Sequence, residues 1–194
     1  MGVFEKYLLI VNVVGFLIYF INYLLYRFTE SANVDKLLTL VALAGGSLGI
    51  VVFIALFDRK SVKENMMSRV FVICVLIIQL VAVLFFKGVH GEQITFAFWE
   101  FFGKYKILIV YLVVINFVSF AAFAIDKINA IEGRSRIRII TLLGLAFVGG
   151  SIGALLGMYI LRHKIRVDYF TVGIPLIMIM QVVVVFFLMN LSFT

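Results

Sequence analysis

Two copies of a glycine-glycine-serine motif stand inside apolar runs, and their small polar groups are the first candidates for chemistry. They read LAGGSLG over residues 43–49 and FVGGSIG over residues 147–153. Because a glycine inside a helix costs about 1 kcal/mol relative to alanine, the doubled glycines indicate a purpose. One interpretation is a broken membrane helix whose exposed backbone groups coordinate a solute or ion. The other is close packing of helices, with serine, asparagine and glutamine as hydrogen-bond partners between them, and the sequence leaves both open.

When the sequence is aligned with itself at an offset of 104 residues, a set of polar residues coincides. Asn12 then falls on Asn116 and the first glycine-glycine-serine on the second, while a two-residue deletion brings Gln79 onto Gln181. These residues are predicted to lie within about two helical turns of the bilayer centre, where uncharged polar groups need hydrogen-bond partners. The candidate solute-binding residues are therefore Asn12, Gly45, Gly46, Ser47, Gln79, Asn116, Gly149, Gly150, Ser151 and Gln181.

Composition decides which elements position these residues. Of the 194 residues, 64% are hydrophobic and 14% charged, and the mean hydropathy is +1.19. A bilayer core needs roughly 20 apolar residues per helix. The runs of that length cover approximately residues 5–27, 35–57, 67–87, 104–126, 138–162 and 169–190. The sequence thus predicts an all-α integral membrane protein with six transmembrane helices, and it leaves no soluble domain for nucleic-acid binding.

The shift also predicts two three-helix repeats of opposite orientation. Three spans are an odd number, so the second repeat must enter the membrane from the side opposite to the first. The predicted domains are residues 1–90, an aromatic interfacial linker over 91–103, and residues 104–194. Nine lysines and arginines flank the side that holds both termini and eight flank the other. This small excess favours cytoplasmic termini.

Basic residues follow the second helix of each predicted repeat. They are Arg59 and Lys60 in the first half and Arg162, His163 and Lys164 in the second. Such clusters are suited to an anionic solute or a lipid headgroup, but they are more typical of basic residues that stabilise the C-terminal end of a helix dipole. Asp126 and Lys127, at the end of the fourth span, are interpreted as pairing with each other.

The second half resembles a known family. The segments NFVSFAAFAIDK, GGSIGALLGM and RHK, with Phe170, Pro175 and Gln181, are similar to small bacterial membrane proteins called domain of unknown function twelve ninety-four. The resemblance covers about residues 105–185. It implies a bacterial cytoplasmic membrane but no activity. It also suggests that single-copy relatives pair as antiparallel dimers, which this chain would fuse into one.

The residue inventory favours two function classes. An enzyme is not expected, because no HExxH or CxxC pattern occurs, and the single cysteine offers no metal site or cofactor attachment. The first class is a transporter or channel for a small solute or ion, with its polar site at the membrane midplane. The second is a non-catalytic membrane interaction or assembly protein that partners a larger membrane complex or further copies of itself. Membrane lipids are expected partners in both cases.

Overall fold

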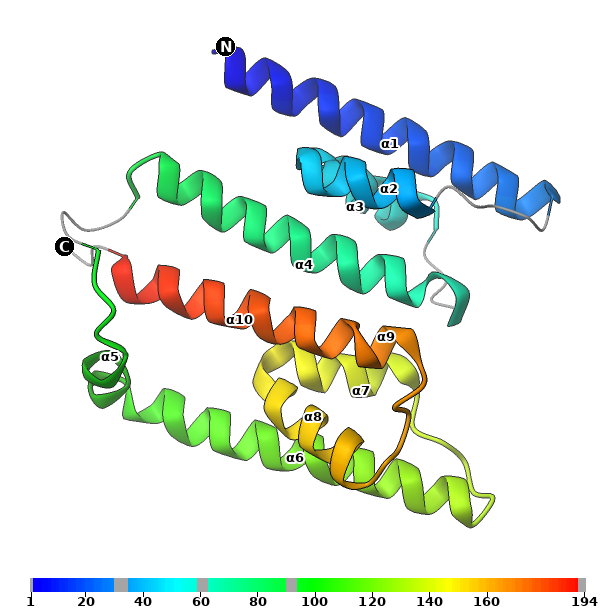
Figure 1. The fold of residues 1–194 in the computed structure, drawn as a ribbon, viewed down its shortest axis with the longest axis vertical. Helices are drawn as coiled ribbons and strands as arrows, with labels where there is room; N and C mark the ends of the chain where they lie inside the picture. The colour runs from blue at the N-terminus through cyan, green and yellow to red at the C-terminus, as the bar shows by residue number, and fades with distance from the viewer. Residues whose placement is uncertain (1, 30–34, 59–62, 90–93, 192–194) are drawn as a thin grey trace. The chain divides into compact units, whose positions relative to one another are not determined.

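The computed structural model describes residues 2–29, 35–58, 63–89 and 94–191 (Figure 1). Every regular element among these residues is a helix. The helices long and apolar enough to cross a membrane cover Val3–Leu25, Lys36–Leu56, Asn65–Phe86, Lys106–Ile131, Ile139–Ile160 and Asp168–Asn190. The predicted all-helical architecture with six apolar spans is therefore confirmed. The chain divides into two compact units, residues 1–80 and 81–194, which are described separately.

Unit 1 is built around the contact between its first helix and the second half of its second span. Its elements are α1 (Val3–Thr29), α2 (Asp35–Val41), the wide turn η1 (Ala42–Gly46), α3 (Ser47–Leu56) and most of α4 (Lys63–Phe86). The buried Phe53 of α3 contacts rings of α1, with its centroid 5.1 Å from that of Phe16 and 5.4 Å from that of Tyr19. These aromatic contacts fix how α3 lies against α1.

Unit 2 has the same order of elements after a short connecting helix. They are α5 (Phe98–Lys104), α6 (Lys106–Ile131), α7 (Ile139–Leu145), the wide turn η2 (Ala146–Gly150), α8 (Ser151–Ile160), α9 (Asp168–Thr171) and α10 (Gly173–Asn190). Here α6 packs against α8. Phe123 of α6 and Phe170 of α9 are fully buried, and their rings meet edge to face with centroids 5.6 Å apart.

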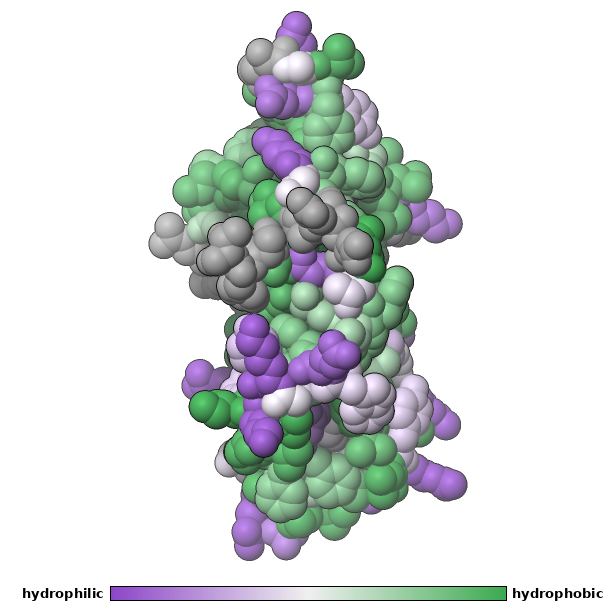
Figure 2. Space-filling model, turned by 90° about the vertical axis from the view of Figure 1, so that its left-hand side faces the viewer, coloured by the Kyte–Doolittle hydropathy of each residue, from purple (hydrophilic) through white to green (hydrophobic). Residues whose placement is uncertain are grey.

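The outer surfaces of the spans are apolar. Hydrophobic atoms cover much of the face shown in Figure 2, and large side chains such as Phe117, 72% exposed, and Ile107, 87% exposed, point away from their own unit. Contiguous exposed apolar surface of this kind would be unfavourable in water. It is the expected surface for helices that face lipid tails.

Candidate functional site

The second span of each unit is not a continuous helix, because its backbone breaks at the first glycine of the glycine-glycine-serine motif. Gly45 has φ 113° and ψ 0°, and Gly149 has φ 122° and ψ −6°. Glycine reaches this region readily, whereas a residue with a Cβ rarely does. The break separates α2 from α3 and α7 from α8. It interrupts the regular α-helical hydrogen bonding, and in a bilayer any backbone group released by such a break must be satisfied by other parts of the protein.

In unit 2, Gln181 of α10 joins the two sides of the break. Its Nε2 donates to the carbonyl oxygens of Ala146 and Phe147, at 2.7 and 2.9 Å. Its Oε1 accepts a hydrogen bond from the Ser151 hydroxyl at 2.6 Å. One side chain therefore holds two carbonyls before the break and the first residue of α8 after it.

Asn116 and Tyr111 of α6 complete the network of unit 2. Asn116 Oδ1 accepts from the Gly153 backbone N–H at 2.7 Å, and its Nδ2 donates to the Gly149 carbonyl at 2.9 Å. The Tyr111 hydroxyl donates to the Val148 carbonyl. Helix α6 thus supplies partners on both sides of the break, as α10 does.

Most of these bonds recur in unit 1. Gln79 donates to the carbonyls of Ala42 and Leu43, Ser47 donates to Gln79 Oε1, Asn12 Oδ1 accepts from Gly49 N, and the Tyr7 hydroxyl donates to the Ala44 carbonyl. The two tyrosines were not among the predicted site residues. Tyr7 and Tyr111 are also 104 residues apart, so the repeat offset contained the signal that identifies them.

The last glycine of each motif allows very close helix contact. A Cβ placed on Gly49 would lie 1.9 Å from the backbone oxygen of Asn12, and one on Gly153 would lie 1.9 Å from that of Asn116. Such a distance is far below van der Waals contact, so only glycine fits at either position. The motif therefore contains both features considered from the sequence, a helix break at its first glycine and close packing at its last.

The predicted polar residues come together within each unit, and protein partners occupy much of their hydrogen-bonding capacity. Unit 1 gathers Asn12, Gly45, Gly46, Ser47 and Gln79, and unit 2 gathers Asn116, Gly149, Gly150, Ser151 and Gln181. Solute binding at these residues stays a prediction. Among the described residues no group of three His, Cys, Asp or Glu could hold a metal ion.

A second polar cluster lies where α8 ends. The Asp126 carboxylate of α6 is fully buried, with Oδ2 at 2.8 Å from both Lys164 Nζ and His163 Nε2. Its Oδ1 accepts from the Ile137 backbone N–H at 2.8 Å. The predicted pairing of Asp126 with Lys127 is therefore wrong: the turn after α8 brings Lys164 to the carboxylate, although it is remote in sequence.

This cluster changes the interpretation of the basic residues. The side chains of His163 and Lys164 are only 14% and 13% exposed, whereas Arg162 is exposed. A headgroup or anion site at these three residues stays a prediction, and Arg162 is the member that is open to a ligand. Arg59 and Lys60, the other residues predicted for a headgroup or anion site, lie outside the described residues.

Unit 1 closes the equivalent end of its broken span with different residues. Asp58, two residues after the end of α3, pairs with Arg69 of α4 at 3.1 Å and accepts a hydrogen bond from the Tyr19 hydroxyl at 3.0 Å. Asn22 stands at the position that corresponds to Asp126. Both units therefore place an ion pair at this end, but the acid and the base come from different elements.

Six apolar helices, two of them broken at a glycine, define a multi-pass all-helical membrane protein. The family model described as "Protein of unknown function (DUF1294)" matches residues 116–170. The uncharacterized protein YsdA of Bacillus subtilis (strain 168) is 35% identical over 79 residues, which are 41% of this chain and 89% of YsdA. The chain belongs to the DUF1294 family. No solved structure matches it.

The family match covers part of the site of unit 2, without Tyr111 and Gln181. It begins at Asn116, ends at Phe170 and includes the broken span with the Asp126 cluster. Because the aligned residues make up most of YsdA but less than half of this chain, YsdA is less than half as long as this chain.

Proposed function

We propose that the chain arose by tandem duplication of a three-helix unit and that its two copies cross the bacterial cytoplasmic membrane in opposite directions. Support comes from the recurrence of the same contacts in both units, at an offset of 104 residues for the asparagine, serine, glycine and tyrosine and 102 for the glutamine. An odd number of spans per copy inverts the second copy. The length of YsdA, close to one copy, fits this origin, and single-copy relatives would then pair as antiparallel dimers.

We further propose that the protein is a transporter or channel for a small solute or ion, with its polar site near the membrane midplane. The observation that carries the proposal is the break at Gly45 and Gly149, at matching positions of two membrane spans. Discontinuous helices in paired repeats are a common way of exposing backbone groups to a solute inside a membrane. The cost of breaking a helix there argues for a purpose beyond crossing the bilayer.

The arrangement around Gln181 suggests how such a site would work. Its amide holds the carbonyls before the break and the serine hydroxyl after it. Rotation about Gly149 would release these groups together, and a solute with matching donors and acceptors would replace the glutamine. Exchange of one set of hydrogen bonds for another keeps the backbone satisfied in both states.

The alternative function is a non-catalytic partner of a larger membrane complex or of further copies. The observation that favours it is the extent to which Gln181 and Asn116 are already bonded within their unit. A network that is satisfied internally rigidifies a helix bundle, as an assembly protein requires. Lipids are partners under either function.

The inverted arrangement predicts opposite accessibility of two loops. With Cys74 replaced by alanine, single cysteines at Ser61 and at Ile165 should react with a membrane-impermeant maleimide from opposite sides, one in intact cells and the other in inverted vesicles. The reason is that these positions follow the second and the fifth span. Labelling of both from one side would contradict the inverted topology, and labelling of each from both sides after permeabilisation is the control for reactivity.

Transport predicts a measurable permeability that depends on the serines. Proteoliposomes exposed to gradients of potassium chloride, glycerol or urea should change light scattering faster than protein-free vesicles for at least one of these solutes. Ser47→Ala with Ser151→Ala should slow that change roughly tenfold, because each substitution removes a hydroxyl that would bind the solute in place of the glutamine, a hydrogen bond worth about 0.5–1.5 kcal/mol. Ser135→Ala, in the loop before α7, is the control. Wild-type rates equal to those of protein-free vesicles for all three solutes would favour the assembly function.

A further inference from the structure

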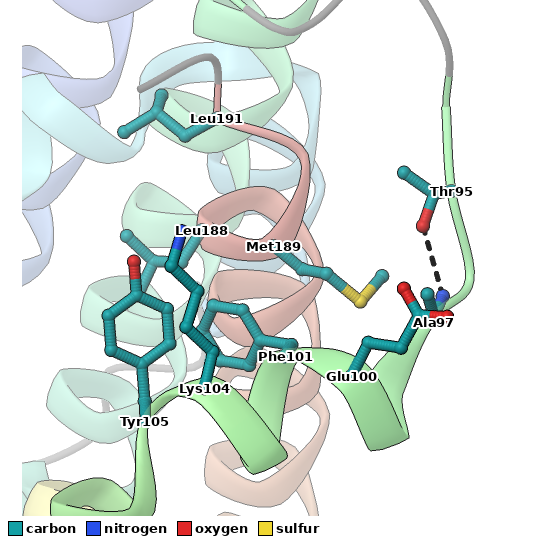
Figure 3. Close-up of a pocket in the computed structure, with 9 residues that line it drawn as sticks. All are labelled: Thr95, Ala97, Glu100, Phe101, Lys104, Tyr105, Leu188, Met189 and Leu191. Atoms are coloured by element: carbon teal, nitrogen blue, oxygen red, sulfur yellow. Dashed lines mark hydrogen bonds between the residues drawn. The ribbon is translucent and has the colours of Figure 1, made fainter. Parts of the chain in front are cut away.

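A pocket of about 390 Å³ lies within unit 2 between α5, Tyr105 and the C-terminal end of α10 (Figure 3). Its volume is in the range of small-ligand sites. Leu188 and Met189 of α10 form an apolar wall, and α5 contributes charged side chains. The pocket therefore combines an apolar and a polar lining.

The segment that faces α10 across the pocket is held by Asn190, the last residue of α10, which is 3% exposed. Asn190 Oδ1 accepts from the Thr95 backbone N–H at 2.7 Å, and its Nδ2 donates to the Thr95 carbonyl at 3.1 Å. The Thr95 hydroxyl accepts from the Ala97 N–H at 3.0 Å, the bond drawn in Figure 3. These bonds fix the segment before α5 to the end of α10 without using the charged residues of the pocket.

Two opposite charges line the pocket on one face of α5. Glu100 and Lys104 are four residues apart, a spacing that places both on the same side of a helix, and Figure 3 shows both beside the end of α10. Neither Glu100 nor Lys104 forms an ion pair with any residue in the described part of the chain. Lys104 Nζ lies 5.7 Å from the centroid of the Tyr105 ring. Both charges are therefore available to a ligand.

The pocket lies at the depth of lipid headgroups. The span of α6 begins at Lys106, and that of α10 ends at Asn190. Trp99, on the same short helix, is 92% exposed, and tryptophan at the end of a span is typical of the membrane interface. A ligand at this place meets lipid on one side and water on the other.

We propose that this pocket binds the zwitterionic headgroup of phosphatidylethanolamine. Lys104 would contact the phosphate, and Glu100 would accept hydrogen bonds from the primary ammonium group. Phosphatidylglycerol has the phosphate but no cation for Glu100, and the quaternary ammonium of phosphatidylcholine has no N–H to donate. The assignment does not depend on the transport proposal, because it uses neither broken span.

Trp99 is the chain's single tryptophan and reports on this helix directly. We prepare phosphatidylcholine vesicles that contain one brominated lipid at a fixed mole fraction. Brominated phosphatidylethanolamine should be enriched at Trp99 about fivefold over brominated phosphatidylcholine, because only its ammonium group donates hydrogen bonds to Glu100, a difference of about 1 kcal/mol. Brominated phosphatidylglycerol should quench no more than brominated phosphatidylcholine does. Equal quenching by all three lipids would overturn the proposal.

Variants separate this site from general basic anchoring. Lys104→Gln and Glu100→Gln should each abolish the preference, whereas Lys106→Gln, an exposed lysine that does not line the pocket, and Glu132→Gln should retain it. The assignment would be overturned if the wild type instead preferred phosphatidylglycerol and Glu100→Gln kept that preference. Soluble phosphoethanolamine should leave Trp99 fluorescence unchanged, because it lacks acyl chains. If phosphoethanolamine changed Trp99 fluorescence in the wild type but not in Lys104→Gln, the site would bind the free compound, and the proposal that it binds a lipid would be wrong.

Discussion

Gly153→Ala should destabilise the protein by about 3 kcal/mol or more, near the upper end of overpacking effects. The added Cβ would lie 1.9 Å from the Asn116 carbonyl oxygen and 2.7 Å from its carbon. These atoms belong to the backbone of α6, so no side-chain rotation can relieve the clash and the two helices must separate. Separation would also weaken the 2.7 Å hydrogen bond from Gly153 N to Asn116 Oδ1. The free energy of unfolding in mixed detergent–SDS micelles measures the loss.

A second glycine of the same span provides the matched control. A Cβ on Gly144 of α7 would have no atom within 4 Å, and Gly144 faces outward. Gly144→Ala should therefore raise stability by about 0.5–1 kcal/mol, since alanine is the better helix former. Gly49→Ala should repeat the loss in unit 1. A Gly153→Ala protein as stable as the wild type would contradict the observed contact of α6 with α8.

Asp126→Asn should destabilise the protein by about 3 kcal/mol, because loss of one partner leaves the other charge buried and uncompensated. The carboxamide introduced by this substitution keeps an acceptor for the Ile137 N–H, so the change isolates the charge. Lys164, 13% exposed, would then lack its carboxylate. The same unfolding measurement detects the effect.

A double-mutant cycle tests whether Asp126 and Lys164 act as a pair. Lys164→Met alone should also destabilise, and the double variant should lose clearly less than the sum of the two single losses, as expected for residues in contact. Asp168→Asn, which removes an exposed acid from α9, should stay within about 0.5 kcal/mol of the wild type. Additive losses would show that the two residues do not interact.

The network around Gln181 extends the interpretation made from the sequence. The repeat offset identified both glutamines and both asparagines as equivalent polar residues, and the structure gives each pair the same kind of partner. Those partners are backbone groups near the helix breaks: carbonyls for the glutamines and the N–H groups of Gly49 and Gly153 for the asparagines. The offset could not reveal this, because it shows which residues correspond and not what each one contacts.

Sequence alone determined the membrane class and the six spans, since hydropathy is summed along the chain and a bilayer requires about 20 apolar residues per helix. It also determined the equivalent positions in the two halves. The break at Gly149 had to come from the tertiary structure, because two adjacent glycines fit both a straight and a broken span. The folded chain also shows which distant residues meet. It likewise decided that Asp126 pairs with Lys164, 38 positions further along the chain. That pairing depends on how closely and at what rotation α6 lies against α8, and the glycine contacts set that spacing.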